Sequence, residues 1–236
     1  ARDPERGYLA TANNEPWGFT ADGRVDNDPF YYGYLYDLGD RAARIESELR
    51  RLIARGKLTP GDMATLQGDA RMAMADDLIP PLAEAVAAIG TDPALAQYRT
   101  RTDLIQLFAQ LSTWDRQMRR DSAAAVTFFA VAHFATQRAL ADDLGPMLPV
   151  LFQADTGFAF KPLRLALQGV PAAQGLLQEG KRVILVGALA DTADWLMKRF
   201  GTVLPTADKP YAWKDVHAAE FNHILGSKWN GAAVAV

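Results

Sequence analysis

The chain has 236 residues, of which 49% are apolar, and a formal net charge of −3. This size and composition predict one large domain or two small ones with a sizeable core. Charges of both signs are interspersed, so we expect no basic surface for nucleic acid. No apolar run is long enough to span a membrane. The absence of cysteine excludes cysteine nucleophiles, thiolate metal sites and disulfides.

The N-terminal segment predicts a short strand followed by an aromatic loop. Residues 7–12 alternate loosely between apolar and polar, as a strand does, and two side-chain amides, Asn13 and Asn14, follow directly. Residues 15–39 combine glycine, proline and aspartate with many aromatic residues. Loops this rich in aromatic rings usually pack on a core or line a cavity.

From Asp40 onward the pattern is mostly helical. A first helix presents one apolar face and ends near Gly56, a typical C-cap. The run Thr59-Pro60-Gly61-Asp62 predicts the start of a second helix, which we expect to continue to about Leu78, before Pro80-Pro81. Further helices are expected over 81–89, from Asp92, along the apolar stripe at 104–114, over 122–142 and over 181–200. A connection is expected at 145–161, a loop at 201–210, and the start of a strand within 229–236.

The adjacent amides Asn13 and Asn14 allow two interpretations. A carboxamide at a strand end is a neutral, rigid donor suited to a site where negative charge develops on an oxygen during acyl transfer. Asparagine also ends many strands, because it tolerates unusual backbone angles and bonds its own chain.

Two arginines open the helix that begins at Asp40. Arg41 could orient the asparagine, or a substrate carbonyl, through its fixed fork of donors. Alternatively Arg41 and Arg44 are surface residues with Glu46 and Glu48 nearby. Because a cation in the first turn opposes the helix dipole, something else must compensate Arg41.

No metal or cofactor is predicted. The three histidines, His133, His217 and His223, lack ligand spacing, so a zinc hydrolase is a minor alternative. The acidic pairs 76–77 and 142–143 are expected on solvated surface or at helix ends. A structural calcium site at 26–28 is conceivable, but the residues there lack a full ligand motif and favour a turn.

Several segments, in this order, resemble the penicillin acylase family of N-terminal nucleophile (Ntn) hydrolases. They are Gly-Tyr-Leu-Ala-Thr-Ala-Asn-Asn-Glu-Pro (7–16), Gly-Asp-Arg-Ala-Ala-Arg-Ile (39–45), Leu-Gln-Gly-Asp (66–69) with Leu-Ile-Pro (78–80), Leu-Ser-Thr-Trp-Asp (111–115) with Asp-Ser-Ala-Ala (121–124), and Trp-Lys-Asp-Val-His (213–217) with Phe-Asn-His-Ile-Leu-Gly (221–226). Each is a modest pattern, but their common order over nearly the whole chain is specific.

The resemblance implies a periplasmic or secreted amidase that is made as one precursor and cut into α and β chains. The new N-terminal serine of the β chain would be the nucleophile and, through its α-amine, the base. Asn13 is similar to the family's oxyanion asparagine, and Arg41 to the arginine that supports it. Substrates across the family are acyl amides, including penicillins, acyl-homoserine lactones and lipopeptide side chains.

Because Ala1 is not a nucleophile, the chain resembles an interior portion of the β subunit. Its partners would be the α chain, the remaining β segments and a small N-acyl substrate, with no nucleic acid and no membrane. Trp17, Phe19 and Tyr31 are candidates to line the acyl or leaving-group side.

The expected fold is α+β: part of an αββα sandwich, mostly helical, with one or two strands at the ends of the piece. The expected divisions are a strand and aromatic loop of the catalytic core (1–39), a helical region packed on it (40–210) and a return to the sheet (211–236). The alternative function is a non-catalytic helical interaction module, which would also account for the missing nucleophile.

Overall fold

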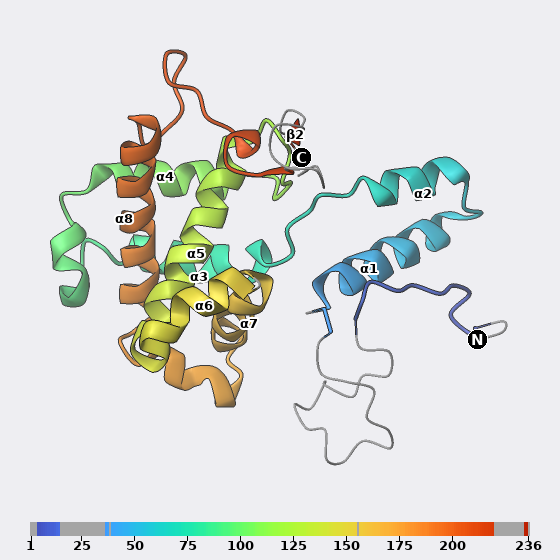
Figure 1. Cartoon of the computed structure of the whole chain (residues 1–236), viewed down its shortest axis with the longest axis horizontal. Helices are drawn as coiled ribbons and strands as arrows, with labels where there is room; N and C mark the ends of the chain where they lie inside the picture. The colour runs from blue at the N-terminus through green and yellow to red at the C-terminus, as the bar shows by residue number, and fades with distance from the viewer. Residues whose placement is uncertain (1–3, 15–35, 38, 155, 220–233, 236) are drawn as a thin grey trace, which may run out of the picture. The chain divides into compact units, whose positions relative to one another are not determined.

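The computed structural model describes residues 4–14, 36–37, 39–154, 156–219 and 234–235. The chain divides into two compact units, an N-terminal unit, Ala1–Asp69, and a C-terminal unit, Ala70–Val236. Figure 1 shows that helices make up most of the described chain in both units. The predicted, mostly helical character of this piece is therefore confirmed, while the sandwich around it and the three predicted divisions stay predictions.

In the N-terminal unit, residues 7–12 do not form the predicted strand. The chain there is extended or bent, and its one described bridge is a parallel pair between Asn14 and Asp37. A strand needs a neighbour that takes up its backbone groups along its length. The Asp37 N–H donates to the carbonyl oxygen of Asn13 at 2.8 Å, and this single bond sets the path of the chain without a ladder.

Two helices complete the N-terminal unit. Helix α1 (Asp40–Arg55) buries Leu49 and Leu52 and ends at Gly56 with φ 130°, as its pattern predicts. Helix α2 (Pro60–Gln67) begins with a capping box, in which the Asp62 N–H donates to the Thr59 hydroxyl while the Asp62 carboxylate accepts from the Thr59 N–H.

The prediction that this second helix continues to Leu78 is wrong, because α2 ends at Gln67. The chain beyond Ala70 is extended and pairs with a distant segment instead. The Met72 N–H donates to the carbonyl of Arg116 at 2.8 Å, and the Met118 N–H donates to that of Ala70 at 2.9 Å.

In the C-terminal unit, helix α3 (Ala75–Ala87) runs through Pro80 and Pro81, where a helix boundary was expected. An interior proline costs about 3 kcal/mol or more. The helix buries an apolar face that offsets this cost, since each fully buried large aliphatic side chain contributes about 1.5–3 kcal/mol. Its large buried aliphatic residues are Leu78, Ile79, Leu82 and Val86.

The next elements follow the sequence pattern closely. The 3₁₀ helix η2 (Pro93–Tyr98) is capped by Asp92, and α4 (Thr102–Ser112) buries its predicted leucine stripe. Helix α5 (Ala123–Leu144) begins where Ser122 accepts a hydrogen bond from the Ala125 N–H.

The segment 145–161, expected as a connection, is largely helical. It contains η3 (Gly145–Met147), α6 (Leu148–Ala154) and the start of α7 (Thr156–Leu167). Glycine and proline favour loops, but Pro146 occupies the first turn of η3, where its missing N–H is not needed.

Helix α8 (Lys181–Phe200) is confirmed as predicted and is the centre of this unit's core. The 3₁₀ helix η4 (Pro171–Leu177) precedes it. Leu185, Leu189 and Leu196 on α8 are fully buried. Figure 1 shows α8 beside α5, and α3 and α4 also pack against α8.

The end of the chain returns to short elements. After the predicted loop at 201–210 comes the 3₁₀ helix η5 (Trp213–Asp215). Strand β1 (Ala218–Ala219) pairs antiparallel with β2 (Val234–Ala235), which lies in the tail where a strand was expected. Among the described residues, no helix combines the length and apolarity needed to cross a membrane.

Candidate active site

The two neighbouring asparagines have different local roles. Asn14 serves the backbone, since its side-chain Oδ1 accepts a hydrogen bond from the Ala12 N–H at 3.1 Å. Asn13 has a left-handed backbone, with φ 57°, a conformation that asparagine tolerates better than most residues. The interpretation in which an asparagine side chain bonds its own backbone therefore fits Asn14. The side chain of Asn13 has a different partner.

That partner is Arg41. The Arg41 Nη2 donates to Asn13 Oδ1 at 2.8 Å and to the carbonyl oxygen of Ala12 at 3.0 Å. One guanidinium nitrogen thus contacts both the side chain of Asn13 and the backbone just before it. The structure brings together the two residues that the sequence proposes as a pair.

Asp37 resolves the conflict between Arg41 and the helix dipole. Its Oδ2 accepts from Nε and Nη2 of Arg41 at 3.2 and 3.1 Å, and its Oδ1 accepts from the Gly39 N–H at 3.2 Å. Asp40 adds an acid in the first turn of α1 itself. Asp37 is not among the residues predicted from the sequence, although it stands four positions before Arg41, the spacing at which acids pair with arginines on helices.

The orientation of the Asn13 amide follows from these contacts. Because Arg41 can only donate, it pairs with the amide oxygen, and the Nδ2 end of the same amide points away from the guanidinium. The side chains of both residues are exposed. The arrangement therefore presents a neutral N–H donor that a ligand can reach.

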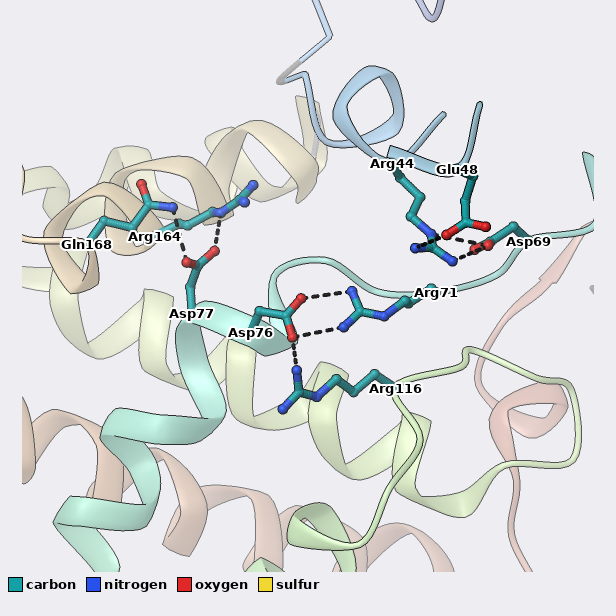
Figure 2. Close-up of polar contacts among 9 residues, drawn as sticks. All are labelled: Arg44, Glu48, Asp69, Arg71, Asp76, Asp77, Arg116, Arg164 and Gln168. Carbon is teal, nitrogen blue, oxygen red and sulfur yellow. Dashed lines mark hydrogen bonds and ion pairs between the residues drawn. The ribbon is translucent and has the colours of Figure 1, made fainter. Parts of the chain in front are cut away.

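Arg44 lies one helical turn further on and has a structural role. It pairs with Asp69 at 2.5 Å and with Glu48 at 2.8 Å, as Figure 2 shows. The hydrogen bonds that Arg44 donates to the Asp69 carboxylate are the main reason that the pKa of Arg44 is raised above its usual value. The pair with Asp69 joins α1 to the segment just after α2, so Arg44 supports the unit that carries Asn13.

In the C-terminal unit, Asp76 and Asp77 bind arginines and do not form a pair of catalytic acids (Figure 2). Asp76 pairs with Arg71 at 2.8 Å and also with Arg116, whereas Asp77 pairs with Arg164 at 2.5 Å. General acid–base catalysis needs carboxyl groups that face a common cleft. Here the two carboxylates hold different segments to the start of α3.

The described histidines have aromatic neighbours. The ring of His133 lies 4.5 Å from that of Phe152, and His217 stacks on Trp213 at 4.8 Å. Within the described residues, no three metal-binding side chains come together. His223, the possible calcium turn at 26–28, and Trp17, Phe19 and Tyr31 lie outside the described residues.

The structure thus shows an exposed carboxamide that an arginine holds, in a mostly helical chain. Comparison with known proteins gives the class of protein. The family model for penicillin amidase matches residues 1–236. The chain belongs to the penicillin amidase family, an amidohydrolase lineage within the Ntn hydrolases. A search of curated proteins found no match. Family membership indicates acylase-type amide hydrolysis.

Proposed function

We propose that this chain supplies the oxyanion-binding asparagine, Asn13, to an amide-hydrolysing acylase. The observation that carries the proposal is the hydrogen bond from Arg41 to Asn13 Oδ1, 2.8 Å long. It leaves the amide N–H group directed away from the arginine, on an exposed side chain. In a penicillin amidase family member, that donor suits the oxygen of a tetrahedral intermediate.

The attacking group would be the N-terminal serine of a β chain, on a different segment or chain. Its α-amine takes the hydroxyl proton as the oxygen attacks the amide carbonyl carbon. The carbonyl oxygen then carries negative charge, which the Nδ2–H of Asn13 stabilises. Collapse of the intermediate expels the amine, which takes up the proton, and water later cleaves the acyl-serine ester. Arg41 keeps the amide of Asn13 in its donating orientation.

Family membership also supports the wider setting that we propose. The substrate is an N-acyl compound such as a penicillin or an acyl-homoserine lactone, and the bond cleaved is a linear amide outside any ring. The enzyme matures from a precursor into α and β chains within an αββα sandwich, and it acts in the periplasm or outside the cell. Trp17, Phe19 and Tyr31 line the acyl or leaving-group side.

The test is kinetic and uses the complete, processed enzyme. Asn13→Gly is the sharper variant, because glycine accepts the left-handed backbone at φ 57° without the steric cost that alanine incurs. We expect kcat to fall by about 10²–10³-fold, the usual effect of losing one oxyanion donor. KM should change little. Asn13→Ala should lose at least as much activity, and an unchanged kcat in both variants would remove Asn13 from the mechanism.

A further inference from the structure

Asp37 contacts both members of the Asn13–Arg41 pair. Its carboxylate accepts two hydrogen bonds from Arg41, at 3.1 and 3.2 Å, and its backbone N–H donates to the carbonyl oxygen of Asn13 at 2.8 Å. The other carboxylate oxygen accepts from the Gly39 N–H. One residue thus joins the start of α1, the guanidinium and the backbone at residue 13.

Apart from Asp37, the described partners of Arg41 are the side chain of Asn13 and the carbonyl oxygen of Ala12, both of which accept from Nη2. The Arg41 side chain is 59% exposed, and a long, exposed arginine samples many rotamers unless hydrogen bonds hold it. The Asn13 amide, in turn, can rotate about its terminal torsion and exchange its oxygen and nitrogen ends. A misplaced guanidinium therefore allows the amide to present an acceptor where a donor is needed.

We propose that Asp37 is a positioning residue for the Asn13 carboxamide, an inference that rests on the proposed function. Asp37 fixes the guanidinium of Arg41, and Arg41 fixes which end of the amide faces the substrate. Asp37 itself does not touch the substrate.

The substitution Asp37→Asn separates the carboxylate from the backbone. The backbone N–H that bonds to Asn13 is retained, so the path of the chain at residue 13 keeps its support. The new amide has one acceptor oxygen and one NH₂ group. Whichever way it turns, its NH₂ group faces a donor, either that of Arg41 or the N–H of Gly39.

The expected result is a selective loss of kcat in the complete, processed enzyme. Asp37→Asn should lower kcat about tenfold, because the amide and guanidinium must be ordered again in each turnover, with KM within about twofold of the parent. The matched control is Glu46→Gln, an acid on α1 that pairs with Arg6 and Arg50 away from Asn13. Its kcat should stay within about twofold of the parent.

The same substitution in the Asn13→Gly enzyme tests how Asp37 acts. If Asp37 works through the carboxamide, Asp37→Asn should have almost no further effect once that group is absent. A tenfold loss that persists there overturns the proposal, because it marks general damage. If the Asp37→Asn enzyme does not mature, Asp37→Glu, which keeps the charge, replaces it in both the parent and the Asn13→Gly enzyme. A loss of kcat from Asp37→Glu that persists in the Asn13→Gly enzyme likewise overturns the proposal.

The outcomes separate this inference from the function on which it rests. An unchanged kcat in Asn13→Gly removes the oxyanion role, and the role of Asp37 with it. A large loss in Asn13→Gly together with an unchanged kcat in Asp37→Asn leaves the oxyanion role standing and removes Asp37 alone.

Discussion

The substitution Gly187→Ala tests how α5 and α8 pack together in the C-terminal unit. A Cβ atom added at Gly187 would lie 2.5 Å from Nη1 and 2.6 Å from Cζ of Arg138 on α5. The Arg138 guanidinium therefore packs flat against the glycine. It also forms a two-pronged ion pair with Asp191, at 2.6 and 3.0 Å, one turn further along α8.

The energetic consequences of Gly187→Ala oppose each other. Alanine in a helix interior is favoured over glycine by about 1 kcal/mol. To make room, however, the guanidinium must move by about 1 Å to reach ordinary contact distance, which breaks its alignment with Asp191. Because both side chains are about one-third exposed, that pair contributes only about 1 kcal/mol. We therefore expect no net gain in stability from Gly187→Ala.

A double-mutant cycle in urea unfolding isolates this effect. In an Arg138→Ala background the obstacle is absent, so Gly187→Ala should stabilise by about 1 kcal/mol. The predicted coupling between the two sites is therefore about 1 kcal/mol. An equal stabilisation in both backgrounds would refute the packing of the guanidinium on Gly187.

Four further outcomes are expected. Arg41→Ala should lose activity or precursor processing; full activity with normal maturation would make it an ordinary surface arginine. Burial lowers the pKa of His133, so the unfolded state binds its proton first as the pH falls, and stability declines below about pH 6.5. His133→Gln should reduce that decline in denaturant unfolding, and equal pH slopes for parent and variant would contradict this. Thr59→Ala removes the acceptor for the Asp62 N–H and should speed hydrogen exchange in α2 by about fivefold; unchanged exchange would mean that the cap contributes little. N-terminal sequencing of the purified enzyme should find a chain that starts with serine, and its absence would favour the non-catalytic helical module.

Local signals predicted much of the helical framework. Ser122 and Gly56 mark helix ends because a capping hydroxyl and a glycine with positive φ act within one turn. The same local logic failed at Pro80 and Pro81, where burial of an apolar face outweighs the missing donors. It also failed over residues 7–12, because strand formation depends on partners that a single segment cannot specify.

The candidate site shows a similar division. The sequence pointed to Asn13 and Arg41 through chemical type and family resemblance. In the structure, Nη2 of Arg41 lies 2.8 Å from Oδ1 of Asn13. The different use of Asn14 could not be foreseen, because it depends on a turn that brings its Oδ1 to the Ala12 N–H. Asp37 was missed because it precedes the helix, within a segment interpreted only as an aromatic loop.

The central claim is that Asn13 acts as a hydrogen-bond donor, and Asn13→Asp tests it most directly. Aspartate has nearly the same shape, tolerates the backbone at φ 57°, and still accepts from Arg41, but it replaces the donating NH₂ group with an oxygen. In the complete enzyme we predict that kcat falls by at least about 10²-fold, while maturation and folding are retained. A folded, processed Asn13→Asp enzyme with kcat close to that of the parent would contradict the account.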